Sequence, residues 1–256
     1  MRRTSWLAAA AAVALLSCGE VPTLEQGIAY YTPVLLPLPA VAAGDTLRDS
    51  EGHAARLRVR AFGRDSQEIT GLEVTFVPTT LPADVTIDTA GFLVARDTLR
   101  SVQIVGQIEH RLQTSAATLQ IVPEPSAIGR GDDGTADSAY AVPAIKALPV
   151  VVTGVYRGVT TPVNGIIVRF HIDSVQPAGL PPGSAILALT TGGGVLRPDS
   201  LSAVDTTKSA GNASRSVLVP AGSAVKRVFI SASANRLRTG QPLEGSPLRF
   251  TLELKP

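Results

Sequence analysis

The stretch ARLRVRAF, residues 55–62, alternates apolar and charged side chains. Three arginines separate its apolar residues, which are Ala55, Leu57, Val59 and Ala61. Because successive side chains of an extended strand point to opposite faces, this pattern predicts a β-strand with one face on a core and one in water. The arginines are therefore interpreted as the solvent face of a strand and not as a basic patch.

The same alternation recurs along the chain, and Gly, Pro, Asp and Asn separate the runs at intervals that suit turns. Strands are predicted in the first half at 71–76, 84–88, 101–108 and 117–122. In the second half they are predicted at 148–156, 165–172, 184–189, 214–219, 227–234 and 248–254. No long amphipathic helix is predicted between residues 40 and 122. Many short strands with regular turn signals predict an all-β protein made of sandwiches or barrels.

A linker is predicted where the alternation stops, at PEPSAIGRGDDGTAD, residues 123–137. Its two prolines, three glycines and acidic cluster are typical of a connection between domains. The chain then divides into a sandwich at 34–122 and a larger one at 138–256. Within the larger one, residues 176–200 are rich in Pro and Gly and predict an extended loop around the strand at 184–189.

Turn and strand motifs of the first unit resemble a bacterial immunoglobulin-like domain of the group 2 type. The matching residues are Gly44, Asp45, Gly71, Val74, Phe76, Val85, Asp88 and Gly91. The second unit resembles the related group 1, invasin and intimin type, through Val163, Gly165, Val168, Phe170, Asp205, Gly211 and Ala213, although its hairpin DTTKSAG is longer than usual. The resemblance implies two tandem immunoglobulin-like β-sandwiches with a role at the cell surface, and it carries no catalytic residues.

The amino terminus reads as an export signal. Arg2 and Arg3 precede the uncharged apolar run Trp6 to Leu16, which is too short to span a bilayer comfortably. The end of this run and the two residues after it, Leu15-Leu16-Ser17-Cys18, resemble the lipobox of bacterial lipoproteins. The resemblance implies that residues 1–17 are a lipoprotein signal peptide, that cleavage falls before Cys18, and that lipid on Cys18 holds the chain on a membrane. An ordinary secretory signal with a chance cysteine is the alternative.

Cys18 is the single cysteine of the 256 residues, so an internal disulfide is excluded even in an exported setting. Residues 18–33 are predicted to be a lipidated tether, with Val34 to Leu38 opening the first strand. Packing on the sandwich is favoured for Tyr30 and Tyr31, and a position near lipid headgroups is the alternative. Gly19 is compatible with sorting to the outer membrane.

Charge argues against nucleic acid as a partner. Without Arg2 and Arg3 the 23 basic residues fall to 21, which equals the number of acidic residues. No basic block stands out from this neutral balance.

Catalytic and metal-binding patterns are not found, and no cofactor is predicted. His53, His110 and His171 lie apart and show no metal-ligand spacing, so each is interpreted as a surface or turn histidine. The chain has no G-x-S-x-G nucleophile motif, and Gly192 to Gly194 is not followed by the Lys-Ser/Thr of a phosphate loop. We expect a protein that is not an enzyme.

Two features of the linker are candidates for binding. Arg130-Gly131-Asp132 spells a tripeptide that some integrins recognise, although a chance match in a turn-rich linker is the simpler interpretation. Asp132, Asp133 and Asp137 carry oxygen ligands for calcium but lack EF-hand spacing, so a solvated acidic linker is favoured and no metal site is predicted.

The sequence predicts a lipid-anchored protein of the cell envelope that acts as a spacer, adhesion or protein-interaction module. Its predicted partners are the membrane, through Cys18, and an envelope protein or surface ligand. The alternatives are a carbohydrate-binding module, disfavoured by the scarcity of aromatic residues, and an accessory subunit of an envelope complex.

Overall fold

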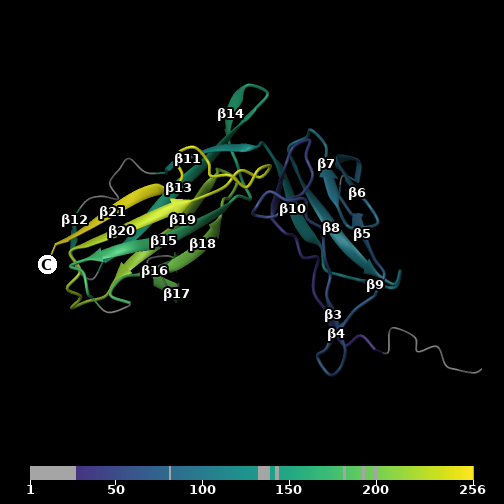
Figure 1. The fold of residues 1–256 in the computed structure, drawn as a ribbon, viewed down its shortest axis with the longest axis horizontal. Coiled ribbons are helices and arrows are strands. Elements are labelled where there is room, and N and C mark those ends of the chain that lie inside the picture. The colour runs from purple at the N-terminus through teal and green to yellow at the C-terminus, as the bar shows by residue number, and fades with distance from the viewer. Residues whose placement is uncertain are drawn as a thin grey trace, which may run out of the picture.

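A computed structural model describes residues 27–80, 82–131, 139–141, 144–180, 183–191, 194–198 and 201–255. Within these ranges the chain is all-β: it has strands, turns and the short 3₁₀ turn Pro82–Asp84, and no α-helix. The strands sort into two β-sandwiches that meet near the middle of the molecule (Figure 1). The predicted all-β fold of tandem immunoglobulin-like sandwiches is confirmed.

One sheet of the first sandwich has the order β2-β10-β8-β5. These strands are Ala40–Ala42, Ala117–Val122, Arg100–Ile108 and Val74–Pro78, and the short β9, Leu112–Gln113, pairs with β8. β2 runs parallel to β10, whereas the other pairs are antiparallel. The run β10-β8-β5 has the G-F-C order of an immunoglobulin sheet.

The opposite sheet is assembled from short pairs. Its strands are β1 (Tyr30–Tyr31), β3 (Ala61–Phe62), β4 (Glu68–Ile69), β6 (Val85–Ile87) and β7 (Leu93–Ala95). Single bridge pairs at Leu35 with Arg58 and at Arg56 with Phe92 connect them across the sheet.

The predicted strand at 55–62 therefore alternates as expected but pairs discontinuously. Leu57 and Ala61 are buried, whereas all three arginines are exposed. In the register that sets Leu35 opposite Arg58, the next hydrogen-bonding positions along the neighbouring chain are Pro33 and Pro37. A proline has no N–H to donate, so the ladder breaks on both sides of the single pair.

The second sandwich has two larger sheets. One has the order β11-β13-β19-β16-β17, with β14 on the side of β13. These strands are Pro125–Arg130, Ala144–Tyr156, Asn212–Val219, Ile186–Thr191, Gly194–Pro198 and, for β14, Val159–Pro162. The other has the order β12-β21-β20-β15-β18, formed by Ala139–Ala141, Leu248–Lys255, Arg227–Ser233, Ile167–Gln176 and Ser202–Thr206.

These orders correspond to the A-B-E-D and G-F-C sheets of an immunoglobulin fold, with one departure. β16 takes the place beside β19 that strand D occupies, yet it comes earlier in the chain than β18, the strand beside β15.

Alternating side chains from facing sheets form the core. Phe170 on β15 and Phe250 on β21 are each 1% exposed, and Leu119 and Ile104 of the first sandwich are fully buried. The buried residues of both sandwiches form one continuous hydrophobic cluster. Because each domain ordinarily has its own core, this continuity indicates close packing at the place where the sandwiches meet.

The structure places strands in three segments for which the sequence predicted a tether, a linker or a loop. Tyr30–Tyr31, placed in the tether, forms β1 against β3. Pro125–Arg130, placed in the linker, forms β11 against β13. The strand predicted at 184–189 corresponds to β16, and the predicted loop after it also contributes β17. β1 and β11 are each ordered by pairing with a strand from another part of the chain, which local alternation does not reveal, whereas β17 forms a local hairpin with β16.

We expect Phe170→Ala to lower the free energy of unfolding by about 3–5 kcal/mol, because it removes a fully buried aromatic ring and leaves a cavity. Val204→Ala on β18, where the side chain is exposed, is the matched control and is expected to change it by no more than about 0.5 kcal/mol. Urea unfolding followed by circular dichroism measures both. Equal effects of the two changes would contradict the assignment of the β15 face to the core.

Candidate functional site

The most elaborate polar arrangement in the described residues lies where the two sandwiches meet, which we call the joint. Two turns touch there backbone to backbone: the Asp49–Gly52 turn of the first sandwich and the Arg236–Gly240 turn of the second. A Cβ atom added to Gly52 would lie 2.4 Å from the carbonyl carbon of Thr239, and one added to Gly240 would lie 2.4 Å from that of Glu51. Both glycines also have positive φ, so neither position accepts a side chain without movement.

Arg238 connects the sandwiches through its side chain and its backbone. Its Nη2 donates to the carbonyl oxygen of Ala43 at 2.9 Å, and its backbone N–H donates to Glu124 Oε1 at 3.2 Å. Its Nε lies 3.7 Å from Asp45 Oδ2 and 3.8 Å from Glu124 Oε2. One arginine of the second sandwich therefore contacts both the first sandwich and the segment between the sandwiches.

The pKa values of the two carboxyls of the joint, Asp45 and Glu124, are shifted in opposite directions. At Asp45, burial acts to raise the pKa, but the hydrogen bonds from Arg48 and the N–H of Thr46, with the charges of Arg48 and Arg238, lower it below its ordinary 3.8. At Glu124, burial is the largest effect and raises the pKa above its ordinary 4.5. Glu124 Oε2 is buried and accepts no hydrogen bond, which agrees with this direction.

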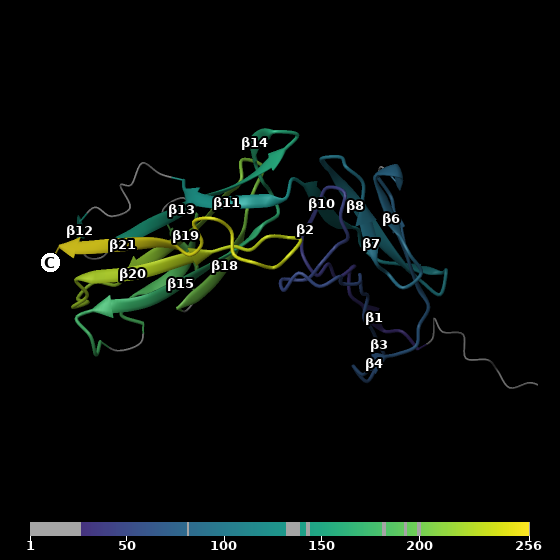
Figure 2. The same ribbon diagram turned by 45° about the horizontal axis from the view of Figure 1, so that its top comes forward.

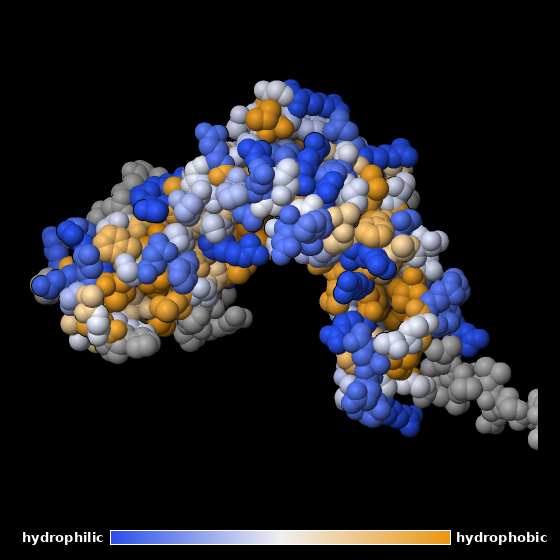
Figure 3. All heavy atoms as spheres, in the orientation of Figure 1, coloured by the Kyte–Doolittle hydropathy of each residue, from blue (hydrophilic) through white to orange (hydrophobic). Residues whose placement is uncertain are grey.

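The β13–β14 hairpin makes a second contact across the joint. The Tyr156 hydroxyl donates to the carbonyl oxygen of Asp97 at 3.1 Å, and Arg157 lies 3.6 Å from the Asp97 carboxylate. Nearby, Asn164 Nδ2 donates to Gln120 Oε1 at 3.2 Å. Hydrophilic residues cover the joint on the face shown in Figure 3, and the outline below it is concave. Contacts on separate turns resist rotation of one sandwich against the other, so the joint can hold a fixed bend.

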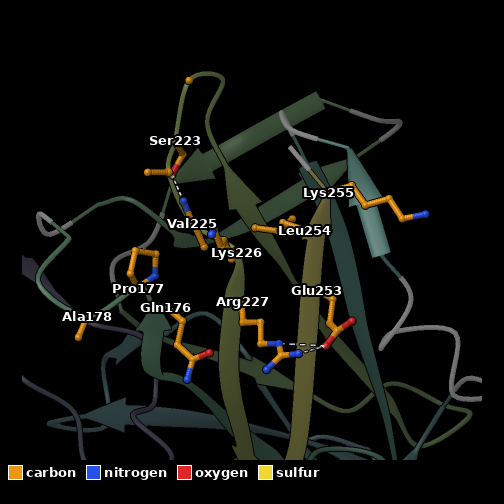
Figure 4. A pocket seen from close by; sticks show the side chains of 12 residues that line it. Gln176, Pro177, Ala178, Ser223, Val225, Lys226, Arg227, Glu253, Leu254 and Lys255 are labelled. Atoms are coloured by element: carbon orange, nitrogen blue, oxygen red, sulfur yellow. Dashed lines mark hydrogen bonds and ion pairs between the residues drawn. The ribbon is translucent and has the colours of Figure 1, made fainter.

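An open groove of about 1160 Å³ lies at the opposite end of the second sandwich (Figure 4). It is lined by the end of β15, the turn before β20 and the end of β21. Arg227 and Glu253 on its wall form an ion pair, with Arg227 Nη2 at 2.9 Å from Glu253 Oε1, and Lys255 points away from this pair. The groove is open to solvent and is not an enclosed cavity.

The structure describes only some of the site residues that the sequence predicted. Cys18 and Asp132, Asp133 and Asp137 lie outside the described residues. Arg130 ends β11 instead of lying in a linker, where its Nη2 donates to the carbonyl oxygen of Arg249 at 2.9 Å and its guanidinium lies 4.8 Å from the ring centre of Phe250. The backbone N–H of Gly131 donates to the carbonyl oxygen of Pro149. Integrin-type recognition by this tripeptide stays a prediction.

The three histidines are exposed and lie on separate elements. His53 follows the Asp49–Gly52 turn, His110 is in the turn between β8 and β9, and His171 is on β15, where its Nδ1 lies 2.7 Å from Ser202 Oγ. No group of three or more His, Cys, Asp or Glu side chains among the described residues is arranged to hold a metal ion.

Sequence reasoning missed the residues of the joint. Arg238 and Glu124 are 114 positions apart, and Glu124 stood in the predicted linker between two prolines. Among the residues of the joint, only Asp45 was singled out by the sequence, as part of the Gly44-Asp45 turn that precedes a strand.

Comparisons with known proteins identify no family. No protein-family model matches the chain, and a search of curated proteins finds no match. Similar solved structures include domains 4 and 5 of the S-layer protein SbsC, at 10% identity and a TM-score of 0.31, covering 90% of this chain and 100% of that one.

Two further similar structures are also multidomain. The D00-D0 domain of intimin has 13% identity and a TM-score of 0.27, and covers 89% of this chain and 100% of that one. The fibronectin(III)-like modules of Clostridium thermocellum CbhA have 11% identity and a TM-score of 0.27, covering 88% of this chain and 94% of that one. At these scores the similarity adds nothing to the strand orders described above. The described residues contain no helix long and apolar enough to cross a membrane.

We expect Gly240→Ala to change the angle between the sandwiches, because its methyl group would overlap the backbone of Glu51. Gly222→Ala is the matched control: Gly222 also has positive φ, but a Cβ there meets no atom within 4 Å. Both changes carry the strain of positive φ, about 1 kcal/mol. Small-angle X-ray scattering is expected to show a changed distance distribution for Gly240→Ala alone. An unchanged distribution for both would contradict the close contact of the turns.

The opposite pKa shifts of Asp45 and Glu124 predict that removing each charge changes the free energy of unfolding in opposite directions. Asp45→Asn removes a carboxylate with a lowered pKa, so we expect a lower free energy of unfolding near neutral pH and a deficit that shrinks as the pH falls below 3.8. Glu124→Gln removes one with a raised pKa, so we expect a higher free energy of unfolding near neutral pH and a difference that disappears below 4.5. Urea unfolding across this pH range measures both, and changes of the same sign would overturn the assignment.

Proposed function

We propose that this chain is an exported lipoprotein, anchored through a lipid on Cys18, that acts as a non-enzymatic spacer, adhesion or protein-interaction module of the cell envelope. The observation that carries the proposal is the position of the ends. The described chain enters at the outer end of the first sandwich, beside β3 and β4, and leaves at the far end of the second (Figures 1 and 2). A tether on the first sandwich holds the second sandwich away from the attachment point.

The joint supports a spacer because it is built to resist bending. Two glycine turns in backbone contact, Arg238 with its carbonyl and carboxyl partners, and the β13–β14 hairpin on Asp97 engage different parts of both sandwiches. A flexible connection between domains would need none of these contacts.

The far end of the second sandwich supports an interaction role. The open groove with Arg227, Glu253 and the exposed Lys226 and Lys255 lies at the end most distant from the first sandwich. Exposed turns and strand ends on a rigid scaffold are where binding surfaces are commonly found. We infer that an envelope protein or surface ligand is contacted there, and that the anchoring membrane is the outer membrane.

The lipid anchor is tested by expressing the full chain and its Cys18→Ala variant in a lipoprotein-competent bacterium. We expect the parent chain to fractionate with membranes and its intact mass to include the lipid, and the variant to lose both, because the thiol that carries the lipid is absent. Ser17→Ala keeps a small residue before the cysteine and is the control that should still be modified. Release of both Cys18 forms at the mass of simple signal cleavage would replace the anchor with secretion.

A further inference from the structure

The outer face of the first sandwich carries a row of cationic and apolar side chains that the proposed spacer role does not use. Arg56, Arg58 and Arg60 project from the same side of the segment that ends in β3. Register places Leu35 opposite Arg58 and Phe92 opposite Arg56. We define the arginine face as Arg56, Arg58 and Arg60 with Leu35, which pairs with Arg58, and Phe62 with Tyr30, which pair with each other.

Only one arginine of this face has a carboxylate partner. Arg60 is paired with Glu68 at 2.6 Å. Arg56 lies 5.5 Å from the ring centre of Phe92, and within the described chain neither Arg56 nor Arg58 forms an ion pair. The other nearby carboxylate, Asp49, accepts hydrogen bonds from the backbone N–H groups of Glu51 and His53. Two guanidinium groups are therefore available to an anionic ligand.

Two hollows flank Arg58 on this face. One, of about 490 Å³, lies between Leu35 to Pro37 and the segment from Ala54 to Arg58, and the other, of about 640 Å³, lies between Arg56 to Arg60 and the side chains of Val74 and Phe76. Each is lined by arginines and apolar residues together with one carboxylate residue, Asp49 in the first hollow and Glu68 in the second. Arginine binds phosphate oxygens through paired donors, so these hollows fit phosphate groups that sit beside apolar chains.

Exposed rings and an apolar side chain extend the face toward the tether. Tyr30 is 49% exposed, stacks on Phe62 with ring centres 4.7 Å apart, and has its hydroxyl-bearing ring at the surface. Leu35 is 39% exposed beside Arg58. Tyrosine and arginine together with exposed apolar residues are typical of protein surfaces at the level of lipid headgroups, where one part of a side chain is apolar and another is polar.

The entry of the chain places this face close to the proposed anchor. The backbone N–H of Ala29 donates to the carbonyl oxygen of Phe62, so residue 27 lies next to the end of the arginine row. The nine residues 18–26 separate this point from the sulfur of Cys18. A fully extended chain of this length reaches about 30 Å. A membrane that holds Cys18 is then within reach of the arginine face.

We propose that the arginine face binds the anionic phospholipid headgroups of the membrane, so that the first sandwich lies on the surface instead of turning freely on its tether. This inference rests on the proposed lipid anchor for its location, but the binding itself is a property of the folded sandwich. The lipid supplies attachment, and the arginine face supplies orientation. The fixed joint then directs the second sandwich at a set angle from the membrane.

The experiment uses the mature chain from residue 18 with Cys18→Ser, which has no lipid and keeps every strand of both sandwiches. Sedimentation with phosphatidylcholine vesicles, with and without phosphatidylglycerol, measures binding at low and high salt. We expect binding only to the anionic vesicles, weakened by salt. Arg56→Gln combined with Arg58→Gln is expected to weaken it about 30-fold.

Lys226→Gln combined with Lys255→Gln is the matched control, because it removes the same charge from the far end of the second sandwich. All variants should unfold at the same urea concentration, since the changed side chains are exposed. The proposal is overturned if anionic vesicles do not bind the parent chain, if both double variants lose binding equally, or if neither does. Binding of soluble polygalacturonate without binding to vesicles also overturns it and assigns the face to an acidic polysaccharide.

Because the chain in this assay has no lipid, the result is independent of whether Cys18 is modified. Failure of vesicle binding with a lipidated Cys18 in cells leaves the anchor intact and removes only the orienting role. Vesicle binding by a chain that is never lipidated in cells removes the anchor and leaves the headgroup-binding face.

Discussion

The backbone contact between the turns at Gly52 and Gly240 is the constraint on which the shape of the molecule depends. It brings Arg238 within reach of Ala43, Asp45 and Glu124, which belong to the other sandwich and to the segment between the two. It also allows the buried residues of both sandwiches to form one cluster. A larger residue at either glycine would separate the turns and with them the polar contacts that accompany the joint.

A second constraint acts within the first sandwich, where two prolines limit the hydrogen bonding of one sheet. Pro33 and Pro37 stand where the chain beside residues 55–62 would continue its ladder, so that sheet is held by single pairs and by core packing on its inner side. The outer side is left with three arginines, one of them neutralised by Glu68. A face with unpaired guanidinium groups and exposed apolar residues contributes little to the stability of the sandwich, and it is the face for which we propose contact with lipid headgroups.

The polar side chains of the described residues therefore serve mainly to hold parts of the structure in fixed positions. Polar clusters connect structural parts: Arg238 joins the sandwiches, Arg227 and Glu253 join β20 to β21, and Arg60 and Glu68 join β3 to β4. Under the proposed function, one end serves attachment, the joint sets direction, and the distant groove and strand ends are presented for contact. Such a division of roles needs rigid sheets more than reactive side chains.

The sequence by itself determined the strands and their faces. Alternation at 117–122 and 248–254 predicted β10 and β21 closely, because which side of a strand is buried is a local property of the chain. Which segments of the chain pair with or contact one another was decided only by the tertiary structure. Neither the pairing of Pro125–Arg130 with β13, nor the contact of Arg238 with Glu124, nor the backbone approach of Gly240 to Glu51 has a local signature. Each joins segments distant in sequence, and their proximity depends on how whole sheets stack, which the period of a single strand does not encode.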